Sequence, residues 1–207
     1  MSAPENTVFV VDDDADVLEG LAVLLATAGH HVVTCGSGAQ LLARLAGETA
    51  GCILLDLRMP GMNGLEVQRE LARRGLGQPV VFLSGHGDIP VAVQAVRAGA
   101  IDFLEKPVRE RPLLAAVEKA LDADRERRAR ERDRREMRDL LASLSPRETQ
   151  VADLLQAGRR TPEIAATLGL SRRTVEMHRA RLLRRLGART SAEAVRIVQR
   201  ARAIIGS

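Results

Sequence analysis

The sequence contains very few aromatic residues and no long apolar run. Aromatic side chains make up 1% of the 207 residues, with no Trp and no Tyr, so the core must consist mainly of Leu, Val, Ile and Ala. No apolar run approaches the roughly 18 residues that a membrane-spanning helix needs. The first residues lack the basic and apolar regions of a secretion signal. We therefore expect a globular protein of the cytoplasm without a membrane segment.

Cysteine is also scarce. Cys35 and Cys52 are the two cysteines of the chain, and both lie in apolar segments typical of strands. Free cysteines behave as small buried hydrophobic residues, and a reducing cytosol keeps them as thiols. The sequence therefore predicts two buried free thiols.

Charge is distributed unevenly along the chain. Residues 1–121 contain 10 basic and 15 acidic residues, residues 122–143 contain 8 and 7, and residues 144–207 contain 13 and 5. An acidic half joined to a basic half predicts two different partners. The net charge of +8 at the basic end indicates a polyanion, most simply nucleic acid. We therefore predict a first domain over residues 1–121, a charged linker over residues 122–143 and a nucleic-acid-binding domain over residues 144–207.

The first 121 residues alternate between apolar runs and helical patterns, one of which covers residues 91–96. Near-continuous apolar runs are typical of strands that helices cover on both faces of a parallel sheet. Five such units fit a doubly wound, flavodoxin-like α/β fold with the strand order 2-1-3-4-5. The predicted strands are residues 7–11, 31–35, 52–55, 79–84 and 101–105.

Residues suited to phosphoryl transfer follow four of these runs. Asp12 and Asp13 follow the first, Asp56 the third, Ser84 the fourth and Lys106 the fifth. Because the carboxyl ends of parallel strands form the sites of such sheets, these side chains should meet. Clustered carboxylates suit Mg²⁺, which also offsets their mutual repulsion. An ionised Asp56 could then act as a nucleophile, while the hydroxyl and the ammonium group hold the phosphoryl oxygens.

Four motifs in this region resemble those of the receiver domain of two-component response regulators. The resemblance covers residues 7–121 and implies that a sensor histidine kinase transfers a phosphoryl group to Asp56. The motifs are Val11-Asp12-Asp13, Asp56-Leu57-Arg58-Met59-Pro60-Gly61-Met62-Asn63-Gly64, Ser84-Gly85-His86-Gly87-Asp88 and Glu105-Lys106-Pro107.

The resemblance also implies a metal site and a switch. Asp12, Asp13 and Asp56 would bind Mg²⁺ together with the backbone carbonyl of Arg58.

Ser84 would be the switching hydroxyl, Lys106 the phosphate partner and Phe103 the aromatic switch, although Phe103 could also be an ordinary core residue. The bond between Lys106 and Pro107 would be cis, as cis peptide bonds are almost confined to proline.

Residues 122–143 contain no Gly or Pro and place opposite charges four residues apart, as in Asp124 and Arg128. Such pairs stabilise a helix by about 0.2–0.5 kcal/mol each. We predict a solvated helical linker, which either only spaces the domains or relays the state of the first one.

The last 64 residues have the pattern of four short helices. Ser145, Pro146 and Glu148 form a capping box at the start of the first, and glycines follow the first three. Four helices with a tight turn between the second and third are typical of a helix-turn-helix domain.

Residues 144–205 resemble the LuxR/FixJ-type effector domain. The matching motifs include Leu144-Ser145-Pro146-Arg147-Glu148 and the stretch Ser171–His178. The resemblance implies that the third helix lies in the major groove of DNA. Base-reading positions would be Glu176, Met177 and Ala180, and backbone or phosphate contacts would be Arg172, Arg173, Thr174 and Arg179.

The two resemblances together predict a phosphorylation-regulated transcription factor that binds DNA as a homodimer and acts through RNA polymerase. The dimer surface could lie in the first domain, the linker or the last helix. The protein would be no enzyme beyond phosphotransfer and dephosphorylation at Asp56. One alternative is a Mg²⁺-dependent phosphohydrolase with Asp12 as nucleophile, which leaves Asp56 and the basic domain unexplained. Another is a regulator whose first domain ignores phosphorylation, although all five key positions are present.

Overall fold

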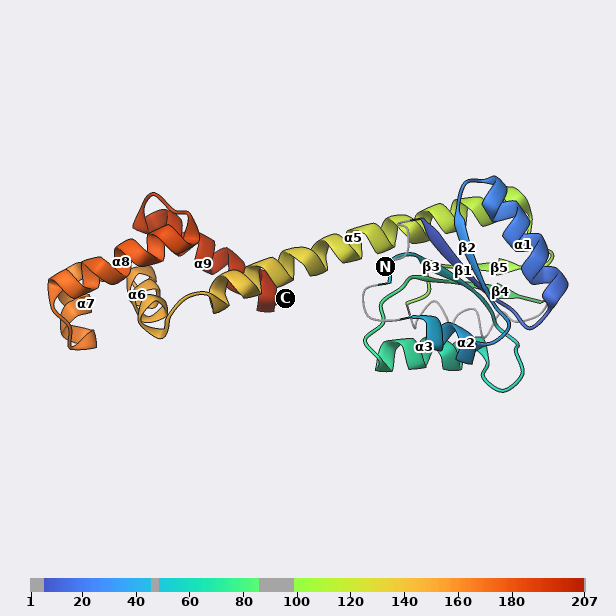
Figure 1. The fold of residues 1–207 in the computed structure, drawn as a ribbon, viewed down its shortest axis with the longest axis horizontal. Helices are drawn as coiled ribbons and strands as arrows, with labels where there is room; N and C mark the ends of the chain where they lie inside the picture. The colour runs from blue at the N-terminus through green and yellow to red at the C-terminus, as the bar shows by residue number, and fades with distance from the viewer. Residues whose placement is uncertain (1–5, 46–48, 86–98, 207) are drawn as a thin grey trace. The chain divides into compact units, whose positions relative to one another are not determined.

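The computed structural model describes residues 6–45, 49–85 and 99–206, which form two compact units, Met1–Arg128 and Ala129–Ser207. The first unit contains a five-stranded parallel sheet with the order β2-β1-β3-β4-β5, so the predicted topology is confirmed (Figure 1). The helical pattern at residues 91–96 lies outside the described residues. The strands are β1 (Thr7–Val11), β2 (His31–Cys35), β3 (Cys52–Asp56), β4 (Val80–Ser84) and β5 (Asp102–Glu105).

Helices cover both faces of this sheet (Figure 1). Helices α1 (Ala15–Thr27) and α5 (Glu110–Ala142) pack on one face, and α2 (Gly38–Arg44) and α3 (Gly64–Arg73) pack on the other. Because successive strand residues point to opposite faces, β1 sends alternate side chains into two separate cores. Strands β1, β3 and β4 are buried throughout, as their continuous apolar runs predict.

Both cysteines lie in this unit as buried free thiols, as predicted. Burial, together with the nearby Asp124 and Glu118, raises the pKa of Cys52 to about 12. Burial also raises the pKa of Cys35, against the opposing effect of Arg44. Since the thiolate is the reactive form, neither side chain is a nucleophile near neutral pH.

Helix α5 is continuous from Glu110 to Ala142, so it crosses the predicted boundary after residue 121 and includes residues 122–142 of the predicted linker. The prediction of a solvated linker is wrong at Asp124, whose exposed fraction is 1%. Its carboxylate accepts a hydrogen bond of 3.0 Å from the backbone N–H of Gly51. It also pairs with Arg127 at 2.5 Å and with Arg128 at 3.0 Å. These partners on its own helix compensate the burial of the charge.

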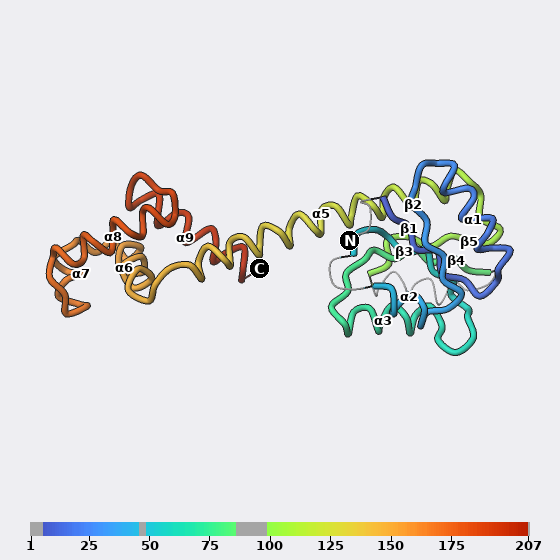
Figure 2. Tube along the Cα trace, viewed as in Figure 1, coloured from blue at the N-terminus to red at the C-terminus, as the bar shows by residue number. Residues whose placement is uncertain are grey.

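The second unit contains four helices around an apolar core, and Figure 2 follows the chain through them. The capping box of Ser145 and Glu148 is present as predicted. Gly169 and Gly187 end two of the helices with φ of 64° and 63°, a left-handed conformation that favours glycine. The helices are α6 (Pro146–Gln156), α7 (Thr161–Leu168), α8 (Arg172–Leu186) and α9 (Ser191–Gly206).

Candidate functional site

Three carboxylates meet at the carboxyl edge of the sheet. Asp12 and Asp13 follow β1, and Asp56 ends β3, its neighbour in the sheet. One carboxylate oxygen of each lies within 4.8 Å of the other two. Asp12 and Asp56 are buried, whereas Asp13 is exposed. The predicted cluster therefore forms, with two shielded carboxylates and one that faces solvent.

Lys106 neutralises part of this negative charge. It follows β5, and its Nζ lies 2.6 Å from Oδ2 of Asp12 and 2.5 Å from Oδ1 of Asp56. Its peptide bond to Pro107 is cis, as predicted. Burial lowers the pKa of Lys106, but its hydrogen bonds to the two carboxylates outweigh this effect and raise the pKa. The ammonium group therefore stays charged between the two acids.

Burial and the neighbouring Asp12 raise the pKa of Asp56, although Lys106 opposes the shift. Backbone N–H groups also orient the buried acids. The N–H of Arg58 donates to Oδ2 of Asp56 at 2.8 Å, and the N–H of Asp14 donates to Oδ1 of Asp12 at 3.0 Å. Each carboxylate is thus fixed by its own loop and not only by Lys106.

The donor set fits a hard divalent cation. Mg²⁺ binds oxygen ligands, keeps several waters and commonly uses one or two carboxylates from the protein. Asp12, Asp13 and Asp56 supply such oxygens on one side of the site, and the exposure of Asp13 leaves that side open to solvent. Asp12 and Asp56, two of the residues that would hold such a cation, also contact the ammonium group of Lys106.

Ser84 and Phe103 lie on the other side of Asp56. Ser84 ends β4, directly after Leu83, which is the register partner of Asp56. The Ser84 side chain is buried, and its hydroxyl donates to the carbonyl of Gly85 at 2.8 Å. Phe103 on β5 is half-buried, with its ring centroid 6.5 Å from that of Phe82. Phe103 therefore packs against the core while remaining partly accessible.

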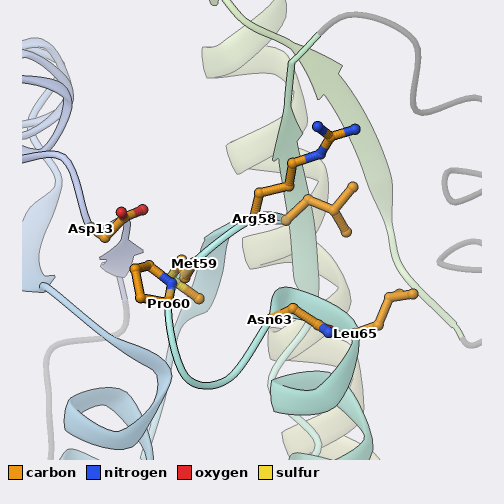
Figure 3. A pocket seen from close by; sticks show the side chains of 7 residues that line it. Asp13, Arg58, Met59, Pro60, Asn63 and Leu65 are labelled. Atoms are coloured by element: carbon orange, nitrogen blue, oxygen red, sulfur yellow. The ribbon is translucent and has the colours of Figure 1, made fainter.

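The loop between β3 and α3 borders an open pocket of about 650 Å³ next to the carboxylates (Figure 3). Asp13 faces this loop from the end of β1. Gly64, the first residue of α3, was not among the predicted site residues. A Cβ atom at Gly64 would lie 2.6 Å from the carbonyl oxygen of Asp56 and 2.9 Å from the ring of Phe82. Only glycine lets α3 begin so close to Asp56.

The exposed surface of α8 carries the predicted DNA-contacting residues. Val175, Leu182 and Leu186 are buried and form the side of the helix that faces the core. Met177 is 40% exposed, one of two large hydrophobic side chains exposed in the described part of the chain. The exposed positions are Arg172, Arg173, Glu176, Met177 and Ala180, and Thr174 and Arg179 are half-buried.

Glu176 has a partner that sequence patterns did not indicate. The hydroxyl of Thr161, the first residue of α7, donates to Oε1 of Glu176 at 2.6 Å. Nη1 of Arg179 donates to the same oxygen at 3.4 Å. The contact joins α7 to α8 between residues 15 apart in the sequence. Helical periodicity relates residues within one helix, so it does not predict this contact.

Both halves of the chain match known families. Residues 8–118 match the response regulator receiver domain, and residues 142–198 match the bacterial regulatory proteins of the luxR family. The chain belongs to the response regulators. Its receiver domain carries the carboxylate site, and its LuxR-type domain carries the exposed face of α8.

Full-length relatives share both domains of this response regulator. The transcriptional regulatory protein FixJ of Azorhizobium caulinodans is 42% identical over 195 residues, which cover 94% of this chain and 92% of that protein. TdiR of Thauera aromatica, a transcriptional regulatory protein, is also 42% identical, with 94% and 86% covered. The solved structure of the response regulator StyR is 43% identical with a TM-score of 0.88, and 94% and 98% of the two chains are covered.

These relatives bear on the remaining alternatives. The family is one of transcriptional regulators rather than of metabolic enzymes, so the phosphohydrolase alternative has no support. Within the described residues, no helix is long and apolar enough to cross a bilayer.

Proposed function

We propose that this response regulator accepts a phosphoryl group on Asp56 from a phosphohistidine of a sensor kinase. An Asp56 oxygen attacks phosphorus, the bond from phosphorus to the histidine nitrogen breaks, and the nitrogen keeps the electron pair. The observation that carries the proposal is the position of Lys106, which contacts both Asp12 and Asp56. Its ammonium group can hold a phosphoryl oxygen when charge builds up on the transferred group.

Asp12, Asp13 and Asp56 would hold the Mg²⁺ ion, with the backbone carbonyl of Arg58 as a further ligand. Bound Mg²⁺ supplies positive charge that screens the carboxylates from each other and from the incoming phosphoryl group. The exposed side of the site at Asp13 is where the phosphodonor would approach. The N–H of Arg58 keeps Asp56 oriented during the transfer.

Ser84 and Phe103 would convert this chemistry into a conformational switch. The Ser84 hydroxyl donates to Gly85 in this structure, and it would turn to a phosphoryl oxygen on Asp56. Phe103 would then move further into the space that Ser84 leaves. Phosphorylation can shift the equilibrium between the two conformations only by the free energy with which the Ser84–phosphoryl contact stabilises one of them.

The LuxR-type domain would place α8 in the major groove of DNA. Arg172, Arg173, Thr174 and Arg179 would contact the backbone and fix the register, and Glu176 with its exposed neighbours would face base edges. Phosphorylation would favour a homodimer that binds two half-sites and acts through RNA polymerase. Since the chromosomal DNA of a bacterium lies in the cytoplasm, we propose that the protein acts in the cytoplasm.

The test combines phosphorylation with DNA selection. The full chain is incubated with Mg²⁺ and acetyl phosphate, intact mass is measured, and genomic fragments are selected in parallel with Asp56→Asn. We expect one phosphoryl group on the wild type, none on the variant, and site enrichment that depends on the phosphodonor for the wild type alone. Equal enrichment by both proteins, with and without phosphodonor, would show that this receiver domain does not control DNA binding.

A further inference from the structure

Glu176 is an acidic residue on the surface of α8 that should face DNA. The basic domain carries a net charge of +8, and Arg172, Arg173 and Arg179 lie on the same helix. A carboxylate close to DNA phosphates is repelled unless a hydrogen-bond donor of the DNA compensates it. Its presence among arginines therefore points to a donor on a base edge.

The contacts of Glu176 leave one oxygen available for such a donor. Thr161 and Arg179 both donate to Oε1, at 2.6 Å and 3.4 Å. Oε2 accepts no hydrogen bond from any residue within the described ranges. Since Thr161 is half-buried at the start of α7, its hydroxyl restricts the Glu176 side chain from a second helix. The side chain is thus held by one oxygen and presents the other.

The major groove offers few partners to a lone acceptor. Guanine and thymine present acceptors there, so they repel a carboxylate. Adenine presents an amino donor beside the N7 acceptor, whereas cytosine presents its N4 amino donor without a neighbouring acceptor. A single carboxylate oxygen therefore matches cytosine best.

We propose that Glu176 selects one cytosine in each half-site through its N4 amino group, and that Thr161 is the residue that positions it. The inference rests on the proposed docking of α8 in the major groove and adds the base that this position recognises. Met177 and Ala180 beside it are exposed apolar groups, which suit thymine methyl groups rather than a second polar contact.

The experiment is a selection of random duplex DNA by the phosphorylated full chain, followed by sequencing. For the wild type we expect cytosine at one position of each half-site, preferred about 5-fold over the other bases, the lower end of the range for a bidentate base contact, because one oxygen makes this contact. Glu176→Gln replaces the carboxylate with an amide that pairs with N6 and N7 of adenine, so the preference should change to adenine.

Two further variants separate positioning from general charge. Thr161→Val removes the hydroxyl at nearly constant shape, and we expect the cytosine preference to weaken without a change of base. Asp153→Asn removes a carboxylate on α6 that pairs with Arg202, and it serves as the matched charge control. It should raise the affinity for all sequences slightly and leave the selected site unchanged.

The outcomes distinguish this inference from the proposed function. If the wild type and Glu176→Gln select the same base equally strongly, the assignment of Glu176 is overturned while DNA recognition stands. If Thr161→Val keeps the full cytosine preference, the positioning role of Thr161 is overturned. If the wild type enriches no sequence, sequence-specific DNA binding itself fails and the cytosine contact fails with it.

Discussion

Replacing Asp124 with Ala should destabilise the receiver domain by about 3 kcal/mol, although the residue lies far along the chain from the phosphorylation site. The carboxylate is buried and accepts the backbone N–H of Gly51, which would lose its acceptor. An unsatisfied buried N–H costs about 1–3 kcal/mol. Arg127 and Arg128 would also lose their shared partner.

The loss of the ion pairs gives the same magnitude, and the two figures describe one substitution, so they are not added. Removing one partner of a fully buried pair costs about 3–5 kcal/mol. The side chains of Arg127 and Arg128 keep 20% and 19% of their exposure, so water can solvate them in part and the cost falls to the lower end. Asp124→Asn should lie between the wild type and Asp124→Ala, because its amide oxygen can still accept from Gly51.

The assay is calorimetric unfolding of the full chain together with hydrogen exchange of the peptide that contains Gly51. Asp122→Ala is the matched control, since Asp122 lies two residues away on α5 and pairs with Arg125 on the exposed surface. Exposed pairs contribute about 0–1 kcal/mol, so this variant should stay close to the wild type. Equal destabilisation by the two variants, or unchanged exchange at Gly51 in Asp124→Ala, would refute the reasoning.

Three other perturbations test the receiver and LuxR-type domains. Lys106→Ala should slow phosphorylation of Asp56 by acetyl phosphate by about 100-fold, measured by intact mass, because a fixed positive charge is lost from the transfer site. Gly64→Ala should destabilise the receiver domain by about 1–3 kcal/mol in calorimetry, since its Cβ would lie 2.6 Å from a backbone oxygen. Burial raises the pKa of Glu148, but hydrogen bonds at the cap of α6 and nearby arginines outweigh it and lower the pKa below 4.5. The stabilisation of the folded state by ionised Glu148 is therefore fully present above pH 4.5, and it is lost as the pH falls through the lower pKa of the folded state. The melting temperatures of Glu148→Gln and the wild type should therefore converge in acid.

Each of these predictions has a result that contradicts it. A phosphorylation rate of Lys106→Ala equal to that of the wild type would remove the ammonium group from the mechanism. Gly20→Ala controls for Gly64→Ala, because nothing lies within 4 Å of a Cβ at Gly20 on α1 and the change should stabilise that helix by about 0.5–1 kcal/mol. Similar effects of the two glycine variants would exclude the close approach as the cause. If the difference in melting temperature between Glu148→Gln and the wild type stays constant from pH 3 to 7, the stability does not depend on the ionisation of Glu148.

Much of the receiver site could be predicted because its residues terminate buried strands. An apolar run followed by Asp12, Asp56 or Ser84 gives both the strand and the edge at which the polar group lies. The strand order then brings separate segments of the chain together. The roles of Ser84 and Phe103 in switching stay predictions, as does the metal ligation by Arg58.

The features that sequence patterns missed depend on contacts between elements. Buried Asp124 accepts a hydrogen bond from Gly51, which lies 73 residues away in the sequence. The pattern of charges along residues 122–143 does not indicate a contact with so distant a residue. The hydrogen bond from Thr161 to Glu176 likewise joins two different helices, α7 and α8. The continuity of α5 agrees with the sequence, because residues 113–142 contain no Gly or Pro that would end a helix.

The shielding of Cys35 and Cys52 makes the chain suitable for spectroscopic probes. Both thiols are buried, and burial keeps them protonated near neutral pH, so maleimide reagents should leave the native protein unmodified. A cysteine introduced at the exposed Ala180 would then be the reactive thiol on the DNA-facing surface. The absence of Trp and Tyr has the same advantage for fluorescence, because one introduced tryptophan would report on its own site without background.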